Sequence, residues 1–169
     1  MLNLLRKSLD RKQLAAALQE QLVARARAPV FYAVLGVPDS MDGRFDLVTL
    51  HAWLVLERLQ AAGLDAVAQA LTDALFIGFD EALREQGIGD MGLGRRMKAM
   101  ANAFFGRLKV YSGAKDRTEL TAVLAKNVWR GAAAGAHASR LAAYVEDARA
   151  ALAVCDIGKG VLDFGPLPG

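Results

Sequence analysis

Three glycines of this 169-residue chain have the spacing of a loop that could bind the phosphates of a dinucleotide. Gly87, Gly89 and Gly92 have the G-x-G-x-x-G spacing of a dinucleotide site. Such a site also needs a strand before the glycines and an acidic residue about twenty positions later. Here a helical pattern precedes the glycines, and positions 107–109 read Arg-Leu-Lys. The spacing therefore predicts the end of a helix followed by a turn.

The two histidines and the single cysteine offer little for catalysis or metal binding. His51 shares an apolar helix face with Val48 and Val55, so we expect a core residue held by one hydrogen bond, whereas His137 begins a polar helix and should be exposed. Neither histidine has the neighbours of a nucleophilic triad. One cysteine, Cys155, excludes a disulfide framework and a Cys-rich zinc site. We expect no catalytic residue, no metal and no cofactor, and hence a protein that is not an enzyme.

A loop rich in carboxylates also invites a metal interpretation. It contains Asp39, Asp42, Gly43, Arg44 and Asp46. Carboxylates three and four positions apart do not match the alternating ligands and final glutamate of a calcium loop. We expect a structural or partner-binding role, in which Asp42 and Gly43 form a turn, Asp46 caps the next helix and Arg44 pairs with a nearby carboxylate.

One predicted helix carries five cations and no acid over fifteen residues. Its apolar stripe recurs at steps of three and four from Leu93 to Tyr111. The residues that we expect on its outer face, as a partner-binding surface, are Arg95, Arg96, Lys98, Phe105, Arg107 and Lys109. Such a surface suits RNA, lipid headgroups or an acidic partner. The alternative is a solvated face balanced by neighbouring acidic helices, because residues 31–91 hold ten acidic and three basic side chains.

The elements that position these residues are predicted to be helices. The chain is 54% hydrophobic and only 7% aromatic, so alanine and leucine, both strong helix formers, dominate. Residues 45–59 are apolar almost all round, which predicts a central, buried helix. Leucines at four-residue steps predict a first helix that stops before Pro29. Glycines predict a loop over 87–94.

We predict an all-α, single-domain bundle of six or seven helices. Residues 1–156 would form the helical domain and residues 157–169 an extended, irregular tail rich in glycine and proline. No uncharged stretch approaches the roughly 20 residues of a membrane span, and the first twelve residues meet charge too early for a signal peptide. We therefore expect a cytoplasmic protein.

Two segments resemble the ubiquinol–cytochrome c chaperone family. The first is PDSMDGRFDLVTLHAWLVLERL at 38–59, and the second is DEALREQGIGDMGLGRRMKAMANAFFGRL at 80–108. The first helix and the Phe-Tyr pair at 31–32 also fit, so the resemblance extends over roughly residues 12–150. The short length and the alanine- and arginine-rich composition agree with an alphaproteobacterial member.

The resemblance implies a non-catalytic chaperone for assembly of respiratory complex III. It implies nascent or apo cytochrome b as the client. The basic charge pattern, and not the resemblance, makes the ribosome or an anionic membrane surface a candidate partner, the latter with a peripheral place at the inner face of the cytoplasmic membrane. We expect no DNA partner. Holding a membrane protein requires an exposed apolar groove, to which methionines at 91, 97 and 100 could contribute. The alternative is a helical lipid- or quinone-binding protein with an enclosed apolar cavity.

Overall fold

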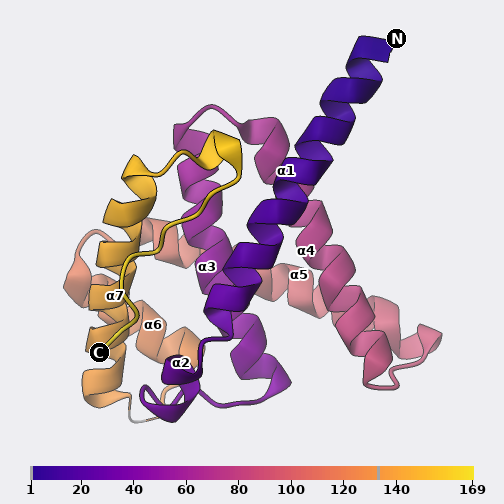
Figure 1. The fold of residues 1–169 in the computed structure, drawn as a ribbon. Coiled ribbons are helices and arrows are strands. Elements are labelled where there is room, and N and C mark those ends of the chain that lie inside the picture. Colours follow the sequence, from indigo (N-terminus) through magenta and orange to yellow (C-terminus); the bar gives the residue numbers. More distant parts are fainter. Residues whose placement is uncertain (1, 133) are drawn as a thin grey trace.

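The computed structural model describes residues 2–132 and 134–169, and within them it contains seven α-helices, one short 3₁₀ helix and no strand (Figure 1). The predicted all-α bundle is confirmed. The elements are α1 (Leu2–Ala26), α2 (Pro29–Ala33), α3 (Met41–Ala61), α4 (Asp65–Glu85), α5 (Asp90–Gly113), α6 (Arg117–Val128), α7 (Gly135–Val154) and the 3₁₀ helix η1 (Ile157–Lys159). None of these helices is both long and apolar enough to cross a membrane.

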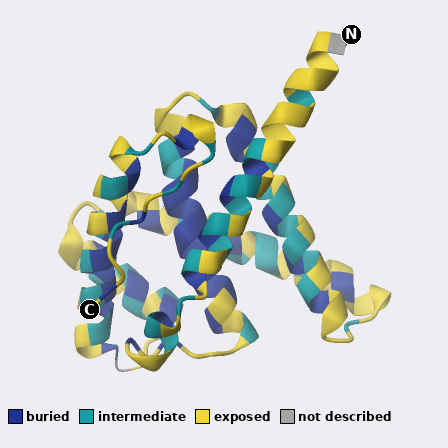
Figure 2. Cartoon of the chain, in the orientation of Figure 1, coloured by how far each residue is buried: buried dark blue, intermediate teal, exposed yellow. Residues whose placement is uncertain are grey.

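The central element is α3, as its apolar pattern predicts. Two thirds of its residues are buried, including Leu50, Leu54 and Leu59. It contacts α1, α4, α5, α6 and α7, and Figure 2 shows the buried residues concentrated along it. A helix without a polar face is stable only where neighbours cover every side, so the other helices pack around α3.

Both α3 and α5 begin earlier than the sequence suggests. Ser40 is the N-cap of α3, and its hydroxyl accepts a hydrogen bond from the Gly43 backbone N–H at 3.1 Å. The predictions of a separate turn at Asp42 and Gly43 and of Asp46 as the cap are therefore wrong, because the serine offers an earlier cap. Likewise α5 begins at Asp90, so the predicted loop over 87–94 extends too far.

The residues after α7 cross the surface of the bundle and are fastened to α1. In Figure 1 this segment, drawn in yellow, runs from η1 along α7. The Gln21 side chain donates to the Gly160 carbonyl at 2.6 Å and accepts from the Leu162 N–H at 3.0 Å. Phe164 is buried and packs edge-on against the His51 ring, with centroids 5.3 Å apart. The tail thus covers part of the core.

The helix α1 has two dissimilar halves. Leu18 and Leu22 of its second half are fully buried and pack in the core with α3 and α4. Its first half projects beyond the other helices, and Figure 2 shows it as largely exposed. The packed half places Gln19, Val23 and the following Arg27 beside α4.

Candidate functional site

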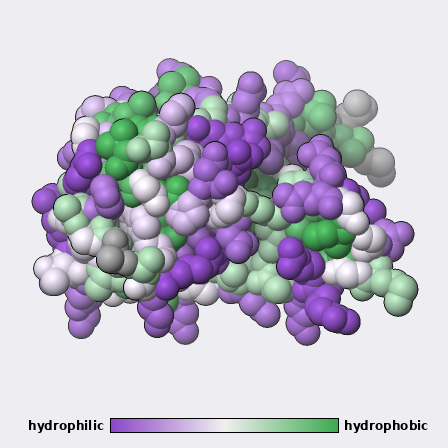
Figure 3. All heavy atoms as spheres, turned by 90° about the horizontal axis from the view of Figure 1, so that it is seen from below, coloured by the Kyte–Doolittle hydropathy of each residue, from purple (hydrophilic) through white to green (hydrophobic). Residues whose placement is uncertain are grey.

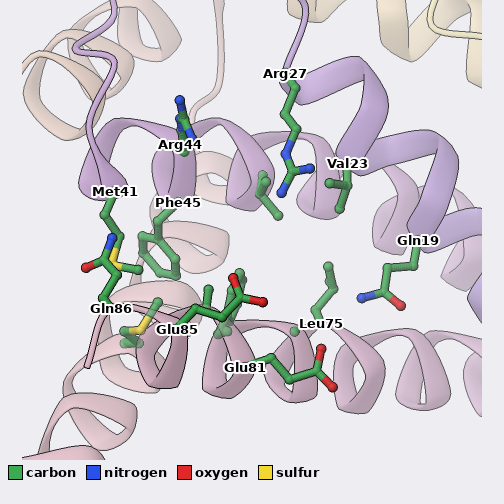
Figure 4. A pocket seen from close by; sticks show the side chains of 15 residues that line it. Gln19, Val23, Arg27, Met41, Arg44, Phe45, Leu75, Glu81, Glu85 and Gln86 are labelled. Atoms are coloured by element: carbon green, nitrogen blue, oxygen red, sulfur yellow. The ribbon is translucent and has the colours of Figure 1, made fainter. Parts of the chain in front are cut away.

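A groove of about 620 Å³ lies between α1, α3, α4 and α5 (Figure 4). Its floor is apolar and includes Phe45 and Val48 of α3 and Phe79 of α4. These three side chains are 8%, 8% and 9% exposed, the highest values among the buried apolar residues that the structure describes. The groove is therefore where the core comes closest to the surface.

The two long sides of the groove carry opposite charges. Arg27 and Arg44 lie on the side formed by α1 and α3, and Glu81 and Glu85 of α4 lie on the other side, with Arg27 and Glu85 pointing toward each other (Figure 4). All four residues are exposed, so the groove opens to solvent. Among the described residues no ion pair joins the two sides. This open, charged-sided groove differs from the enclosed cavity that a lipid- or quinone-binding protein would need.

Polar and flexible side chains line the groove elsewhere. The Gln19 amide donates to the Ala74 carbonyl at 3.0 Å and so joins α1 to α4. Met100 of α5 lines the groove and is half-buried, and Met97 is half-buried against the same core. Met91 is 98% exposed at the start of α5. Methionine adapts to differently shaped apolar partners, so Met100 can give the groove an adjustable wall.

Apolar surface on the outside of the bundle is local. Figure 3 views the molecule from below, and on this face apolar side chains gather in separate patches among hydrophilic ones. Exposed large apolar residues are scattered over several helices, among them Ile77, Phe105 and Val154. Since single exposed apolar side chains are ordinary, the groove with its continuous apolar floor is the stronger candidate for a client site.

The carboxylate-rich segment at the start of α3 connects this helix to α5, and to the residues after α6, through buried ion pairs. Asp46 is fully buried, and its two carboxylate oxygens lie 2.7 Å from Arg107 Nη2 and 3.3 Å from Arg130 Nη2. Burial raises the pKa of Asp46 to about 6 although both arginines oppose this, so the group is ionised at neutral pH. Asp42 is exposed and lies 3.8 Å from Arg130. The expected pairing of Arg44 is confirmed, with Asp39 as its partner at 2.8 Å.

Arg107 does not lie on the outer face of α5, where the charge pattern suggested. Its side chain is only 12% exposed and reaches Asp46 beneath the surface. Arg107 comes three residues after Phe104 and four before Tyr111, both of which are buried. That spacing places the three residues on one helix face, so the sequence did contain the signal for its burial.

The rest of the predicted partner-binding face is exposed. Phe105 is 54% exposed and stacks against Phe76 of α4, with centroids 5.8 Å apart. No ion pair involves the cations of this face among the residues that the structure describes. We call this face the basic surface of α5 and define it by Arg95, Arg96, Lys98, Phe105 and Lys109.

His51 is a core residue, as expected, but it has two hydrogen-bond partners instead of one. Burial lowers its pKa to about 4, so the ring is neutral. Its Nδ1–H donates to the Leu47 carbonyl at 2.7 Å, and its Nε2 accepts from the Tyr144 hydroxyl at 2.8 Å. His137 is half-buried, which corrects the expectation of an exposed side chain. Within the described part of the chain, no cluster of acidic, His and Cys side chains could hold a metal ion.

Comparison with known proteins supplies the family. No curated protein matches the chain. The crystal structure of the Cbp3 homolog from Brucella abortus is similar, with a TM-score of 0.81 and 36% sequence identity over 95% of this chain and 93% of that one. The sequence model of the ubiquinol-cytochrome C chaperone family matches residues 33–157, which include most of the groove and the basic surface of α5. The resemblance found in the sequence is confirmed, and the chain belongs to the ubiquinol-cytochrome C chaperone family.

Proposed function

We propose that this protein is a non-catalytic assembly chaperone of respiratory complex III and that it binds newly made cytochrome b in the groove. Membership of a chaperone family supports the assembly role and the absence of catalysis. The observation that carries the client site is the groove floor, where Phe45, Val48 and Phe79 leave the core partly open. Cytochrome b is a polytopic membrane protein, and its apolar helices need cover before they are inserted and assembled.

The groove suits the face of a client helix better than a whole helix. A volume of about 620 Å³ takes the side chains of a short stretch of helix and leaves its far side in solvent. Arg27, which has no ion-pair partner among the described residues, and the glutamates opposite it favour a client with an acidic residue along one edge and basic residues along the other. Opposite charges of this kind set the orientation of a bound helix more than its affinity.

Two alanines of α4 provide a matched test of the groove. Ala82 lines the groove and is half-buried, whereas Ala66 is exposed near the start of the same helix. A tryptophan at 82 would fill the space for the client. We expect Ala82→Trp to weaken binding of cytochrome b made in a cell-free reaction by roughly tenfold or more, or about 1.4 kcal/mol. Ala66→Trp should bind as the unchanged protein does.

A loss of cytochrome b binding is informative only if the variant is folded and as stable as the unchanged protein. Both tryptophan variants should keep the helical circular dichroism and the urea midpoint of the unchanged protein, because both positions have access to solvent. Cytochrome b binding that survives Ala82→Trp, or that is lost equally in Ala66→Trp, would contradict the groove as the client site.

We further propose that the basic surface of α5 contacts phosphate groups, either of ribosomal RNA or of anionic lipid at the inner face of the cytoplasmic membrane. Its exposed cations have no ion-pair partner among the described residues, and Phe105 adds an exposed aromatic ring. Lysine and arginine facing phosphates gain an attraction that falls steeply with salt. Binding of a charge-removing variant of this surface to ribosomes and to anionic vesicles separates the two sources of phosphate.

A further inference from the structure

The projecting first half of α1 exposes leucines that the bundle does not use. We call residues 2–13 the N-terminal arm (Figure 1). Leu4, Leu5 and Leu9 of the arm are 72%, 65% and 57% exposed. Apolar surface of this kind is unfavourable in water unless something covers it. The exposure is confined to the arm, because the second half of α1 is packed in the core.

Two of the exposed leucines of the arm, Leu5 and Leu9, do not continue the core-facing stripe of α1, whereas Leu4, 18 positions before Leu22, points the same way as that buried residue. Each residue of an α-helix advances about 100° around the axis. Leu9 precedes the buried Leu18 by nine positions, so the two point in nearly opposite directions, about 180° apart. Leu5 shares the face of Leu9 because the two are four positions apart. This face of the arm needs a partner outside the bundle.

The charges of the arm indicate what that partner is. The arm contains four basic residues and one acidic residue, Asp10. Lys7 and Arg11 lie four positions apart on the side opposite Leu5 and Leu9. Among the described residues no ion pair involves the four cations, which are Arg6, Lys7, Arg11 and Lys12. The arm thus has Leu5 and Leu9 on one face, Lys12 at the edge of that face, and Lys7 and Arg11 opposite it, with Leu4 beside Arg11. Exposed leucines flanked by unpaired cations on one helix are typical of binding to the surface of an anionic membrane.

We propose that the N-terminal arm is an interfacial helix that docks this protein on an anionic lipid membrane. Twelve helical residues span about 18 Å, well short of the roughly 30 Å hydrocarbon core, so the arm lies along the surface and does not cross. Leu5 and Leu9 enter the boundary between headgroups and acyl chains, and the cations reach the phosphates. Pairing of two arms through these leucines would bring two basic segments together, which charge repulsion disfavours.

This proposal is separate from the proposed client site. The groove takes Gln19 and Val23 from the packed half of α1 and no residue from the arm. In Figure 1 the arm and the start of α5 lie at opposite ends of the molecule. Loss of membrane docking and loss of cytochrome b binding are therefore distinguishable in one set of variants.

The test is sedimentation of the full chain with vesicles. The probes are neutral phosphatidylcholine vesicles and vesicles that also contain phosphatidylglycerol. We expect binding to the anionic vesicles only, and at least a roughly tenfold loss of affinity in the double variant Leu5→Ser, Leu9→Ser. Ile77→Ser, at an apolar residue of α4 that is 62% exposed, is the matched control and should bind normally. The double variant should still bind cytochrome b in the absence of vesicles.

Fluorescence identifies the face that enters the lipid. In Leu5→Trp the emission should shift to the blue on adding anionic vesicles, whereas Lys7→Trp, on the opposite side of the arm, should shift less. Three results would overturn the proposal: equal binding to neutral and anionic vesicles, normal binding by the double serine variant, or a dimer that this variant converts to a monomer. The last would show that the leucines pair two copies of the chain.

Discussion

The starts of α3 and α5 look alike in sequence and differ in the structure. Each combines glycine, aspartate and basic residues within a few positions. At the start of α3, a Cβ on Gly43 would lie 1.8 Å from the Pro38 carbonyl oxygen. At the start of α5, a Cβ on Gly94 would have no neighbour within 4 Å. The same residue types serve as a packed joint in one helix and as open surface in the other.

The charged residues at the two helix starts differ in the same way: the ion pair of Asp46 is buried at the start of α3, whereas the charges at the start of α5 are exposed. Asp46 of α3 is fully buried and is held by Arg107 at 2.7 Å. Asp90 of α5 is 89% exposed and pairs with Arg84 at 3.0 Å. A buried ion pair fixes the positions of the elements it joins, because either partner left alone would be a costly unpaired charge. Exposed charges contribute little to stability, which leaves those of α5 available for binding a partner.

The largest effect should come from breaking the buried pair. Arg107→Ala leaves the Asp46 carboxylate buried, with Arg130 as its remaining basic neighbour at 3.3 Å. Removing one partner of a buried pair costs about 3–5 kcal/mol, and we expect the lower end because Arg130 remains. Lys109→Ala, two positions along the same helix and exposed, should change the free energy of unfolding by less than about 0.5 kcal/mol. Urea unfolding measures the free energy of unfolding of both variants. Equally small decreases in the two would show that the Asp46–Arg107 ion pair does not hold α3 and α5 together.

The next largest effect on stability should come from replacing Gly43 of α3, compared with Gly94 of α5. Gly43→Ala forces the new Cβ against the Pro38 backbone, so the start of α3 or the preceding loop has to move. We expect a loss of about 3 kcal/mol, in the upper range for overpacking. Gly94→Ala adds a methyl group to open space within a helix and should stabilise the protein by up to about 1 kcal/mol. The midpoint temperature of thermal unfolding should therefore fall in Gly43→Ala and rise in Gly94→Ala. A shift in the same direction for both variants would contradict the difference in packing between the two helix starts.

The helices could be predicted from the sequence because their apolar spacing is strong. The all-round apolar pattern of α3 and the apolar stripe of α5 each indicate a helix and the face that it buries, and the structure confirms both, apart from the positions at which these helices begin. Helix starts were harder. The Ser40 cap lies before the polar residues of the first turn, and glycines within the first turns of α5 read as a loop although they are helical. Local composition does not reveal which of several capping residues the folded chain uses.

The groove could not be predicted because its residues come from four helices. Arg27 and Glu85 face each other across it only after α1 and α4 have packed, and no sequence spacing links them. Arg107 is a different case, since its place between Phe104 and Tyr111 already indicated the buried face. For the arm, spacing defines a helix and two faces, but only the packing shows where the bundle ends and the leucines become exposed.

The smallest effect on folding should come from the basic surface of α5. The triple variant Arg95→Gln, Arg96→Gln, Lys98→Gln removes exposed charges without ion-pair partners among the described residues, so the free energy of unfolding should change by about 0–1 kcal/mol. Each cation facing an anionic surface is worth roughly 1 kcal/mol. Binding to that surface should therefore weaken by about two orders of magnitude, and the remaining binding should depend less on salt.

Two binding partners and one matched control make this last comparison decisive. The control replaces Lys115, Lys126 and Lys159 with glutamine, which removes the same charge from other exposed positions. If the surface contacts ribosomal RNA, the triple variant of α5 should lose ribosome binding, while its binding to phosphatidylglycerol vesicles, which the N-terminal arm provides, stays normal. If it contacts lipid, vesicle binding should fall and ribosome binding should not. If the control variant loses as much affinity as the α5 variant for both ribosomes and vesicles, binding depends only on the net charge of the protein. The start of α5 would then not be a specific binding surface, just as the packed start of α3 is not.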